Sequence, residues 1–193
     1  MSRHCKPEED DRKSGSGFPG RFLGDRSGTT AIEFAALALP FSLLVFAILE
    51  SCIAFAGQEV MANTTDDVAR QLRTGQIRTI DSNQLTKMIC SRLEIMVAKN
   101  CPGLMVDLRT YDTFQQAAAD KFTITNGDIV LTNKGAPTTF KVALGGSGKK
   151  NMLRVFYKWP VMTDFMSKSM SNLSGGNTLH FASVTWQNEP FGN

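Results

Sequence analysis

Side chains that could do chemistry are few in this chain, and their spacing forms no catalytic set. Neither of its two histidines, His4 and His180, has a cysteine or carboxylate at a spacing typical of metal ligands. We expect His180 to be a strand residue with its polar tip at the surface. The segment ALGGSGKK (143–150) resembles a phosphate-binding loop, but Ala143 and Lys150 replace the Gly and the Ser or Thr that such a loop needs. No nucleophile–base motif occurs either, so we expect no enzyme activity, no catalytic residues, no metal and no cofactor.

Two of the four cysteines could close a short disulfide loop. Cys90 and Cys101 both lie in the C-terminal part of the chain, whereas Cys5 lies in the polar N-terminus and Cys52 in an apolar segment. Disulfides persist outside the cytoplasm, so we expect this pair only if that part of the chain is exported. The alternative is two half-buried thiols.

Two carboxylates, Glu33 and Glu50, lie within the apolar segment GTTAIEFAALALPFSLLVFAILESCIAFA, residues 28–56, and bracket its apolar run at residues 34–49. Residues 34–49 would make roughly 24 Å of helix, and a bilayer core needs about 30 Å, so a span must include Glu33 or Glu50. A carboxylate at the bilayer centre costs about 2.5–3.5 kcal/mol, which makes such residues functional candidates by default. For Glu50, a position at the lipid headgroups and a helix–helix contact are both open.

The apolar segment is expected to be the first half of a long helix. A narrow stripe of side chains continues at every fourth position after it, and Gly75 is a typical helix stop. We therefore predict one helix over residues 29–74, kinked at Pro40. Residues 29–56 would cross the membrane, and the remainder would pack on a domain.

The segment before the span sets its expected orientation. Residues 1–28 are charged and rich in Gly and Ser, which predicts a leader without a core. Arg21 and Arg26 precede the span, and the positive-inside rule keeps them in the cytoplasm and sends the C-terminal part outward. Two alternatives are an uncleaved anchor and a signal peptide that ends at the A-x-A of residues 54–56, which would release a domain beginning at Gly57.

Residues 57–193 are predicted to form one α+β domain with a small antiparallel sheet. A second helix is expected over residues 82–99, capped by Asp81 or Ser82. Asn126-Gly127 predicts a tight hairpin turn, because both residues tolerate positive φ. Strands are expected at 105–111, 121–125, 128–132, 151–159 and 178–187, and short helices at 114–120 and 162–170.

The formal net charge of +3 is spread thinly along the chain. Proteins that bind DNA or RNA carry a dense basic face, which this sequence lacks. We therefore expect no nucleic acid partner, and the apolar segment makes membrane lipid an expected partner.

The residues from Gly28 onward resemble a type IV prepilin cleavage site. A hydrophilic leader ends at Gly28, and Glu33 and Phe34 stand fifth and sixth after it, ahead of the apolar helix. This G-xxxx-E-F form is similar to that of the tight-adherence (Tad/Flp) pilus, and the whole pattern resembles the TadE-like pseudopilin family. Further shared features are Pro40, Glu50, V-A-R-x-x-R-x-G (Val68, Ala69, Arg70, Arg73, Gly75), Y-x-W-P (Tyr157, Trp159, Pro160) and N-E-P-F (Asn188, Glu189, Pro190, Phe191).

The resemblance implies a minor pseudopilin of the inner membrane, not an enzyme, with a periplasmic domain over residues 57–193. An aspartyl prepilin peptidase would cut between Gly28 and Thr29 and remove the leader. Glu33 would then pair with the new α-amine of a neighbouring subunit, which offsets the desolvation of both charges; alternatively it only reaches the lipid headgroups.

The partners that the resemblance implies are that peptidase, other pilins or pseudopilins, and the Tad assembly machinery. The protein would act in the assembly of an adhesive pilus and could itself enter the fibre. The competing interpretation is an uncleaved, membrane-anchored periplasmic domain that binds a ligand or envelope partner through its sheet.

Overall fold

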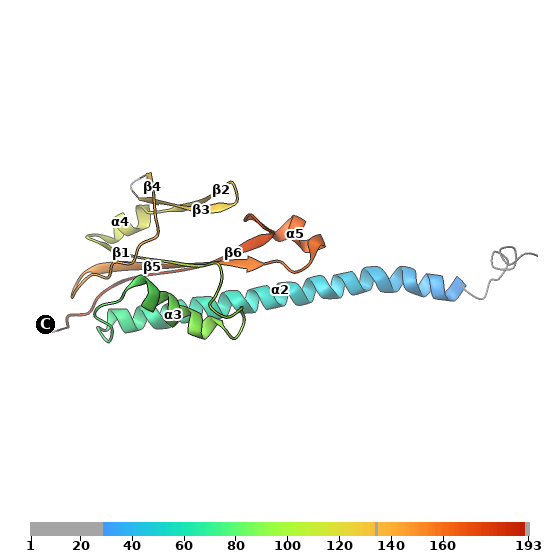
Figure 1. The fold of residues 1–193 in the computed structure, drawn as a ribbon, viewed down its shortest axis with the longest axis horizontal. Coiled ribbons are helices and arrows are strands. Elements are labelled where there is room, and N and C mark those ends of the chain that lie inside the picture. The colour runs from blue at the N-terminus through green and yellow to red at the C-terminus, as the bar shows by residue number, and fades with distance from the viewer. Residues whose placement is uncertain (1–28, 134, 192–193) are drawn as a thin grey trace, which may run out of the picture. The chain divides into compact units, whose positions relative to one another are not determined.

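The computed structural model describes residues 29–133 and 135–191 (Figure 1). Gly28, the predicted cleavage residue, lies outside the described residues. The chain divides into two compact units, one that ends at Val45 and one that begins at Phe46. Most of the elements belong to the second unit.

Helix α2 (Thr29–Arg73) agrees closely with the predicted helix, and Pro40 does not interrupt it. Residues 29–45 are almost all exposed. Among the described residues, α2 is the one helix long and apolar enough to cross a membrane. From residue 57 onward one face of the helix is buried, and its members are Gly57, Met61, Thr64, Thr65, Val68, Ala69 and Leu72.

Helix α3 (Ser82–Leu93) begins with the predicted cap. The Asp81 side chain accepts a hydrogen bond from Gln84 N (2.7 Å), and the Gln84 side chain accepts one from Asp81 N (3.1 Å). This capping box satisfies two backbone donors of the helix start. The predicted end at residue 99 is wrong: the helix stops at Leu93 and a series of turns follows, because the chain must fold back before it enters the sheet.

The central layer is an antiparallel sheet with the order β1 (Leu104–Tyr111), β5 (Lys150–Pro160) and β6 (Asn177–Gln187). Strand β5 pairs with both neighbours along its length. Helices α2 and α3 cover one face of this sheet (Figure 1). The core between them consists of apolar side chains from both layers, including Val68, Leu72, Leu85, Ile89, Val106, Leu108, Leu153 and Val155.

A second small sheet contains β2 (Phe122–Thr125), β3 (Asp128–Asn133) and β4 (Ala136–Thr138). Its first hairpin has the predicted turn, with positive φ at Asn126 (54°) and Gly127 (77°). Two short helices, α4 (Phe114–Ala119) and α5 (Asp164–Met170), complete the unit. The α+β class is confirmed, but the strands form two sheets rather than one.

The reason for two sheets lies at the edge of β1. Leu108 N donates to Lys141 O and Ala143 N donates to Leu108 O, both at 2.8 Å. This short bridge occupies the edge of β1, so the β2–β3–β4 strands pair among themselves. They lie on the face of the central sheet opposite α2, where Phe122 packs edge-on against Phe156 with ring centroids 5.1 Å apart.

Candidate functional site

The predicted processing motif lies on the first turns of α2. The helix begins at Thr29, and Glu33 and Phe34 follow one turn later with both side chains exposed. Phe34 leaves 72% of its surface accessible. A peptidase or a neighbouring subunit needs this kind of access to the motif.

Glu50 binds the loop that leads into α5. Its Oε1 accepts from Met162 N (2.5 Å) and Thr163 N (3.4 Å), and its Oε2 accepts from the Thr163 hydroxyl (2.5 Å). Thr163 is the N-cap residue of α5 but its own side chain makes no capping hydrogen bond. Glu50 is only 6% exposed, so it serves as a buried acceptor for a loop 112 residues away. No local pattern in the sequence could reveal this contact.

Two turns further along α2, Gly57 and Gln58 bind the helix to the sheet. Gln58 Nε2 donates to Phe181 O (2.8 Å) and Phe181 N donates to Gln58 Oε1 (3.2 Å), so an amide side chain pairs with the edge strand β6 as another strand would. The Trp159 ring lies against Gly57, where a Cβ would come within 2.4 Å of the ring. Only glycine permits this approach.

His180 stacks on the ring of Trp159. Its ring lies parallel to that of Trp159, with centroids 4.7 Å apart and an interplanar angle of 16°. The expectation of a polar tip at the surface is wrong, because His180 is buried. Burial lowers the pKa of His180 to about 4, so the imidazole is neutral at pH 7.

The C-terminal end of α2 contacts the C-terminal segment of the chain. Glu189 N donates to Arg73 O (3.0 Å), and the Arg73 and Glu189 side chains form an ion pair at 3.5 Å. Gly75 has a φ of +72°, and a Cβ there would lie 2.6 Å from the Phe191 ring. Arg78 places its guanidinium 5.7 Å from the centroid of the same ring. Two of the segments that carry the family resemblance, V-A-R-x-x-R-x-G and N-E-P-F, therefore meet in space.

Asn188 extends this contact into the loop that resembled a phosphate site. Its Oδ1 accepts from Trp186 Nε1 (2.7 Å) and Asn151 Nδ2 (3.0 Å), and its Nδ2 donates to the carbonyls of Gly145 (2.6 Å) and Gly146 (3.0 Å). The asparagine is buried, and the loop carbonyls point toward it. These hydrogen bonds give the 143–150 loop a structural role. This agrees with the departure of Ala143 and Lys150 from the phosphate-binding motif.

The model of the TadE-like protein family matches residues 28–70. The resemblance is confirmed over this segment. The match begins at the predicted cleavage glycine and covers most of α2. The match relates this segment, and not the rest of the chain, to TadE-like proteins. Searches of curated proteins and of solved structures returned no significant match.

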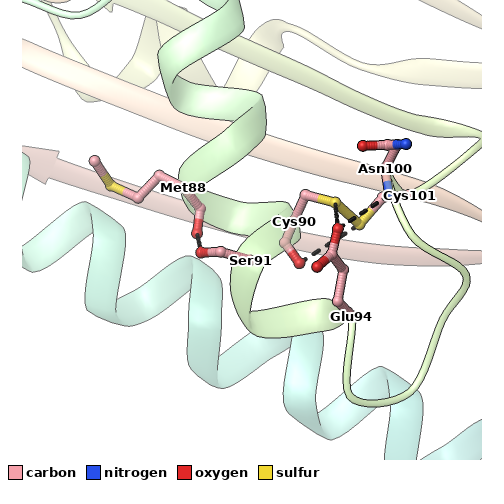
Figure 2. Close-up of a disulfide and its surroundings, with 6 residues drawn as sticks. All are labelled: Met88, Cys90, Ser91, Glu94, Asn100 and Cys101. Carbon is pink, nitrogen blue, oxygen red and sulfur yellow. Dashed lines mark hydrogen bonds between the residues drawn. A yellow bond between two sulfur atoms is a disulfide. The ribbon is translucent and has the colours of Figure 1, made fainter.

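Beyond the TadE-like segment, Cys90 and Cys101 form a disulfide between α3 and the start of β1 (Figure 2). Both residues are buried. Glu94 lies next to the bond, and its Oε1 accepts a hydrogen bond from Asn100 N (3.0 Å). The disulfide closes the turns that end α3 early. Cys52, in the TadE-like segment, is exposed and has a free thiol.

The face of the central sheet opposite α2 carries a buried charge cluster. The Asp107 carboxylate accepts from Arg109 Nε (3.0 Å), Arg154 Nη2 (2.7 Å) and Lys141 N (3.1 Å). Arg154 Nη1, also buried, has no hydrogen-bond partner among the described residues. The cluster joins β1, β5 and the 139–141 segment, a role typical of structural ion pairs.

A cavity of about 380 Å³ adjoins this cluster. Arg109 and Lys141 line it together with Asp112 and Asp120, so its charges balance. The Tyr111 hydroxyl donates to Asp120 (2.6 Å), and burial together with this bond raises the pKa of Tyr111. Within the described part of the chain, no three His, Cys, Asp or Glu side chains are grouped so that they could hold a metal ion.

Proposed function

We propose that the protein is a minor pseudopilin that acts in the assembly of a Tad-type pilus. Residues 29–56 would anchor it in the inner membrane, residues 57–193 would form its periplasmic domain, and prepilin peptidase would remove residues 1–28. The observation that carries the proposal is the TadE-like match, which begins at Gly28. A glycine at the cut has no Cβ to obstruct the approach of a protease to the scissile bond.

Two observations support the proposed orientation. Arg21 and Arg26 lie on the N-terminal side of the span, which favours a cytoplasmic N-terminus. The Cys90–Cys101 disulfide lies on the other side, and disulfides are typical of compartments outside the cytoplasm. Alkylation of free thiols before and after reduction measures the oxidised fraction of this pair in cells, and a fully reduced pair would contradict a periplasmic domain.

The proposed partners are prepilin peptidase, other pilins or pseudopilins, and the Tad assembly machinery. In this proposal Glu33 pairs with the α-amine that cleavage creates at Thr29 of a neighbouring subunit. Glu33→Gln keeps the size of the side chain and removes its charge. We expect this variant to be cleaved normally and to assemble poorly, and unchanged pili on the cell surface would remove Glu33 from the mechanism.

The mature N-terminus decides between the interpretations, and mass spectrometry of the protein purified from membranes determines it. Thr29 supports the pseudopilin. Gly57 would instead mean an exported protein released by signal peptidase, and Met1 or Ser2 would mean an uncleaved anchor.

A pair of glycine variants tests the cut itself. Gly28→Leu places a bulky side chain at the scissile bond and should leave the protein at its full length. Gly24→Leu makes the same change four residues earlier in the leader and should be processed as the wild type is. If both variants have the size of the mature protein and pili form normally, Gly28 is not the processing site.

A further inference from the structure

We propose that an apolar groove beside the start of the second unit rests in the interfacial layer of the membrane and contacts lipid. The inference rests on the proposed membrane anchoring of α2. It adds to that proposal a second lipid contact, made by the folded domain itself rather than by the spanning helix.

The groove is a cavity of about 470 Å³ whose lining is mostly apolar. It is built from α2, the turns after α3 and the last residues of β5, which supply Ile53, Met96, Val97, Trp159 and Pro160, together with Met162 from the following loop. Met162 is 66% exposed and Ile53 42% exposed. Large apolar side chains that gather at a hollow and remain open to solvent indicate a surface that another apolar phase covers.

The helix length places this groove near the membrane surface. Counted back from Leu49, about 20 residues of helix fill a 30 Å bilayer core. Ile53 then lies about 6 Å beyond the edge of the core, within the interfacial layer, which is about 5–7 Å deep on each side. The helix surface leading to it is also apolar and exposed, at Phe46, Ile48, Leu49, Ile53 and Phe55. The groove therefore continues an exposed apolar surface of α2 within the second unit, residues 46–55, which favours lipid as its occupant.

The side chains around the groove suit that layer. Its open apolar side chains are Ile53 and Met162, whereas Tyr157 and Trp159 also line it but are only 5% and 6% exposed. Lys158 lies between them in the sequence, and its ammonium pairs with the exposed Asp128 carboxylate at 3.0 Å, so this charge has a partner outside the apolar lining.

Glu50 has a positioning role in this surface. It accepts hydrogen bonds from the backbone nitrogens of Met162 and Thr163, and so fixes the loop that carries Met162, whose side chain is 66% exposed. The Glu50 carboxyl group, at the edge of the span, therefore points into the domain, and Met162 is the side chain that faces the lipid.

Depth-dependent quenching in the full-length chain tests the proposal. Cys5 and Cys52 are replaced by serine, and a single cysteine at residue 162, 39 or 114 carries an environment-sensitive fluorophore. The proteins are reconstituted into phosphatidylcholine–phosphatidylglycerol vesicles with brominated acyl chains. Position 39 reports the span, and position 114 is an exposed apolar control on α4, at the other end of the domain from α5 (Figure 1).

We expect the brominated lipid to quench positions 39 and 162 several-fold more than position 114, and iodide to quench position 114 most. Adding Glu50→Ala should lower the lipid quenching at 162 and leave that at 39 unchanged. Tryptophan emission from Trp159 and Trp186 checks that each labelled protein is folded.

The failures are distinguishable. Quenching at 39 without quenching at 162 overturns the groove proposal and leaves the anchor intact. If position 39 is not quenched, the anchor itself fails and the groove proposal fails with it. A second copy of the chain could cover the groove instead of lipid. Protection of position 162 from iodide would then disappear when added plain lipid lowers the amount of protein per vesicle, and the lipid proposal would be wrong.

Discussion

The two ends of α2 within the second unit are attached to the rest of the protein in different ways. At the upstream end, Glu50 and Gln58 make long-range hydrogen bonds, and Gly57 meets Trp159 at a distance that excludes any larger residue. At the downstream end, Arg73 and Glu189 form an ion pair with both side chains half exposed.

This difference has an energetic consequence. A buried donor that loses its acceptor costs about 1–3 kcal/mol, whereas an exposed ion pair contributes about 0–1 kcal/mol. We therefore expect the upstream hydrogen bonds to contribute more to stability than the downstream ion pair, in addition to the apolar core that Val68 and Leu72 form with the sheet. The upstream end is also the one beside the proposed membrane surface.

Gly57→Leu should have the largest effect. Its Cβ would enter the Trp159 ring, so the helix and sheet must separate, and we expect a loss of about 3 kcal/mol in the free energy of unfolding. Denaturant titration in detergent micelles, followed by tryptophan emission, measures the loss. Gly146→Leu is the control, because a Cβ at Gly146 has open space around it. Equal losses in the two variants would show that the Trp159 contact is not tight.

Glu50→Ala should have the second-largest effect, a loss of about 2–3 kcal/mol in the free energy of unfolding. The reason is that Met162 N, Thr163 N and the Thr163 hydroxyl all lose their acceptor. Glu59→Ala, an exposed glutamate on the same helix, should stay within about 0.5 kcal/mol of the wild type. Hydrogen exchange of the Met162 and Thr163 amides gives the local measurement. If these two amides exchange equally slowly in Glu50→Ala and in the wild type, Glu50 does not hold the loop.

His180 predicts an acid sensitivity of the same upstream end. Its pKa is about 4 in the fold against an ordinary value of 6.5, so between these values the unfolded chain binds more protons and unfolding becomes easier as the pH falls. Its contribution is fully present above about pH 6.5, and about 2 kcal/mol of it is lost between pH 7 and pH 5. His180→Phe keeps an aromatic ring against Trp159 and should unfold with a pH dependence smaller by that amount. An identical pH dependence in both proteins would mean that the histidine is not buried as a neutral group.

Arg73→Ala tests the downstream end and should have the smallest effect, about 0–1 kcal/mol. A double-mutant cycle with Glu189→Ala isolates the side-chain coupling and leaves the backbone bond between these residues in place. We expect the coupling to decrease further at high salt, because both side chains are open to solvent. A coupling free energy larger than the free energy of unfolding lost in Glu50→Ala would reverse the comparison between the two ends.

Local signals in the sequence predicted most of the elements. The apolar run and the stripe after it predicted α2 nearly to the residue, Asp81 predicted the start of α3, and Asn126-Gly127 predicted the hairpin turn. These features depend on neighbours within a few residues, which is the range over which hydrophobic periodicity and capping act. The processing motif is equally local, and its match to the TadE-like model begins at Gly28.

The errors and omissions all involve distant partners. The end of α3 depends on a chain reversal closed by Cys101, and the division into two sheets depends on Leu108 pairing with the 141–143 segment. His180 is buried because Trp159 covers it, and nothing in its own strand indicates that.

The sequence by itself determined a long apolar helix with a prepilin-like start, an α+β domain behind it, and two carboxylates that needed explanation. Only the tertiary structure decided what Glu50 does, because its acceptor role depends on Met162 and Thr163, which reach it only when the sheet has brought the end of β5 back to α2. The same holds for the contact between Arg73 and Glu189, two residues from segments that the sequence marked separately. Pairings between such distant segments depend on the packing of the whole domain, and no local propensity encodes them.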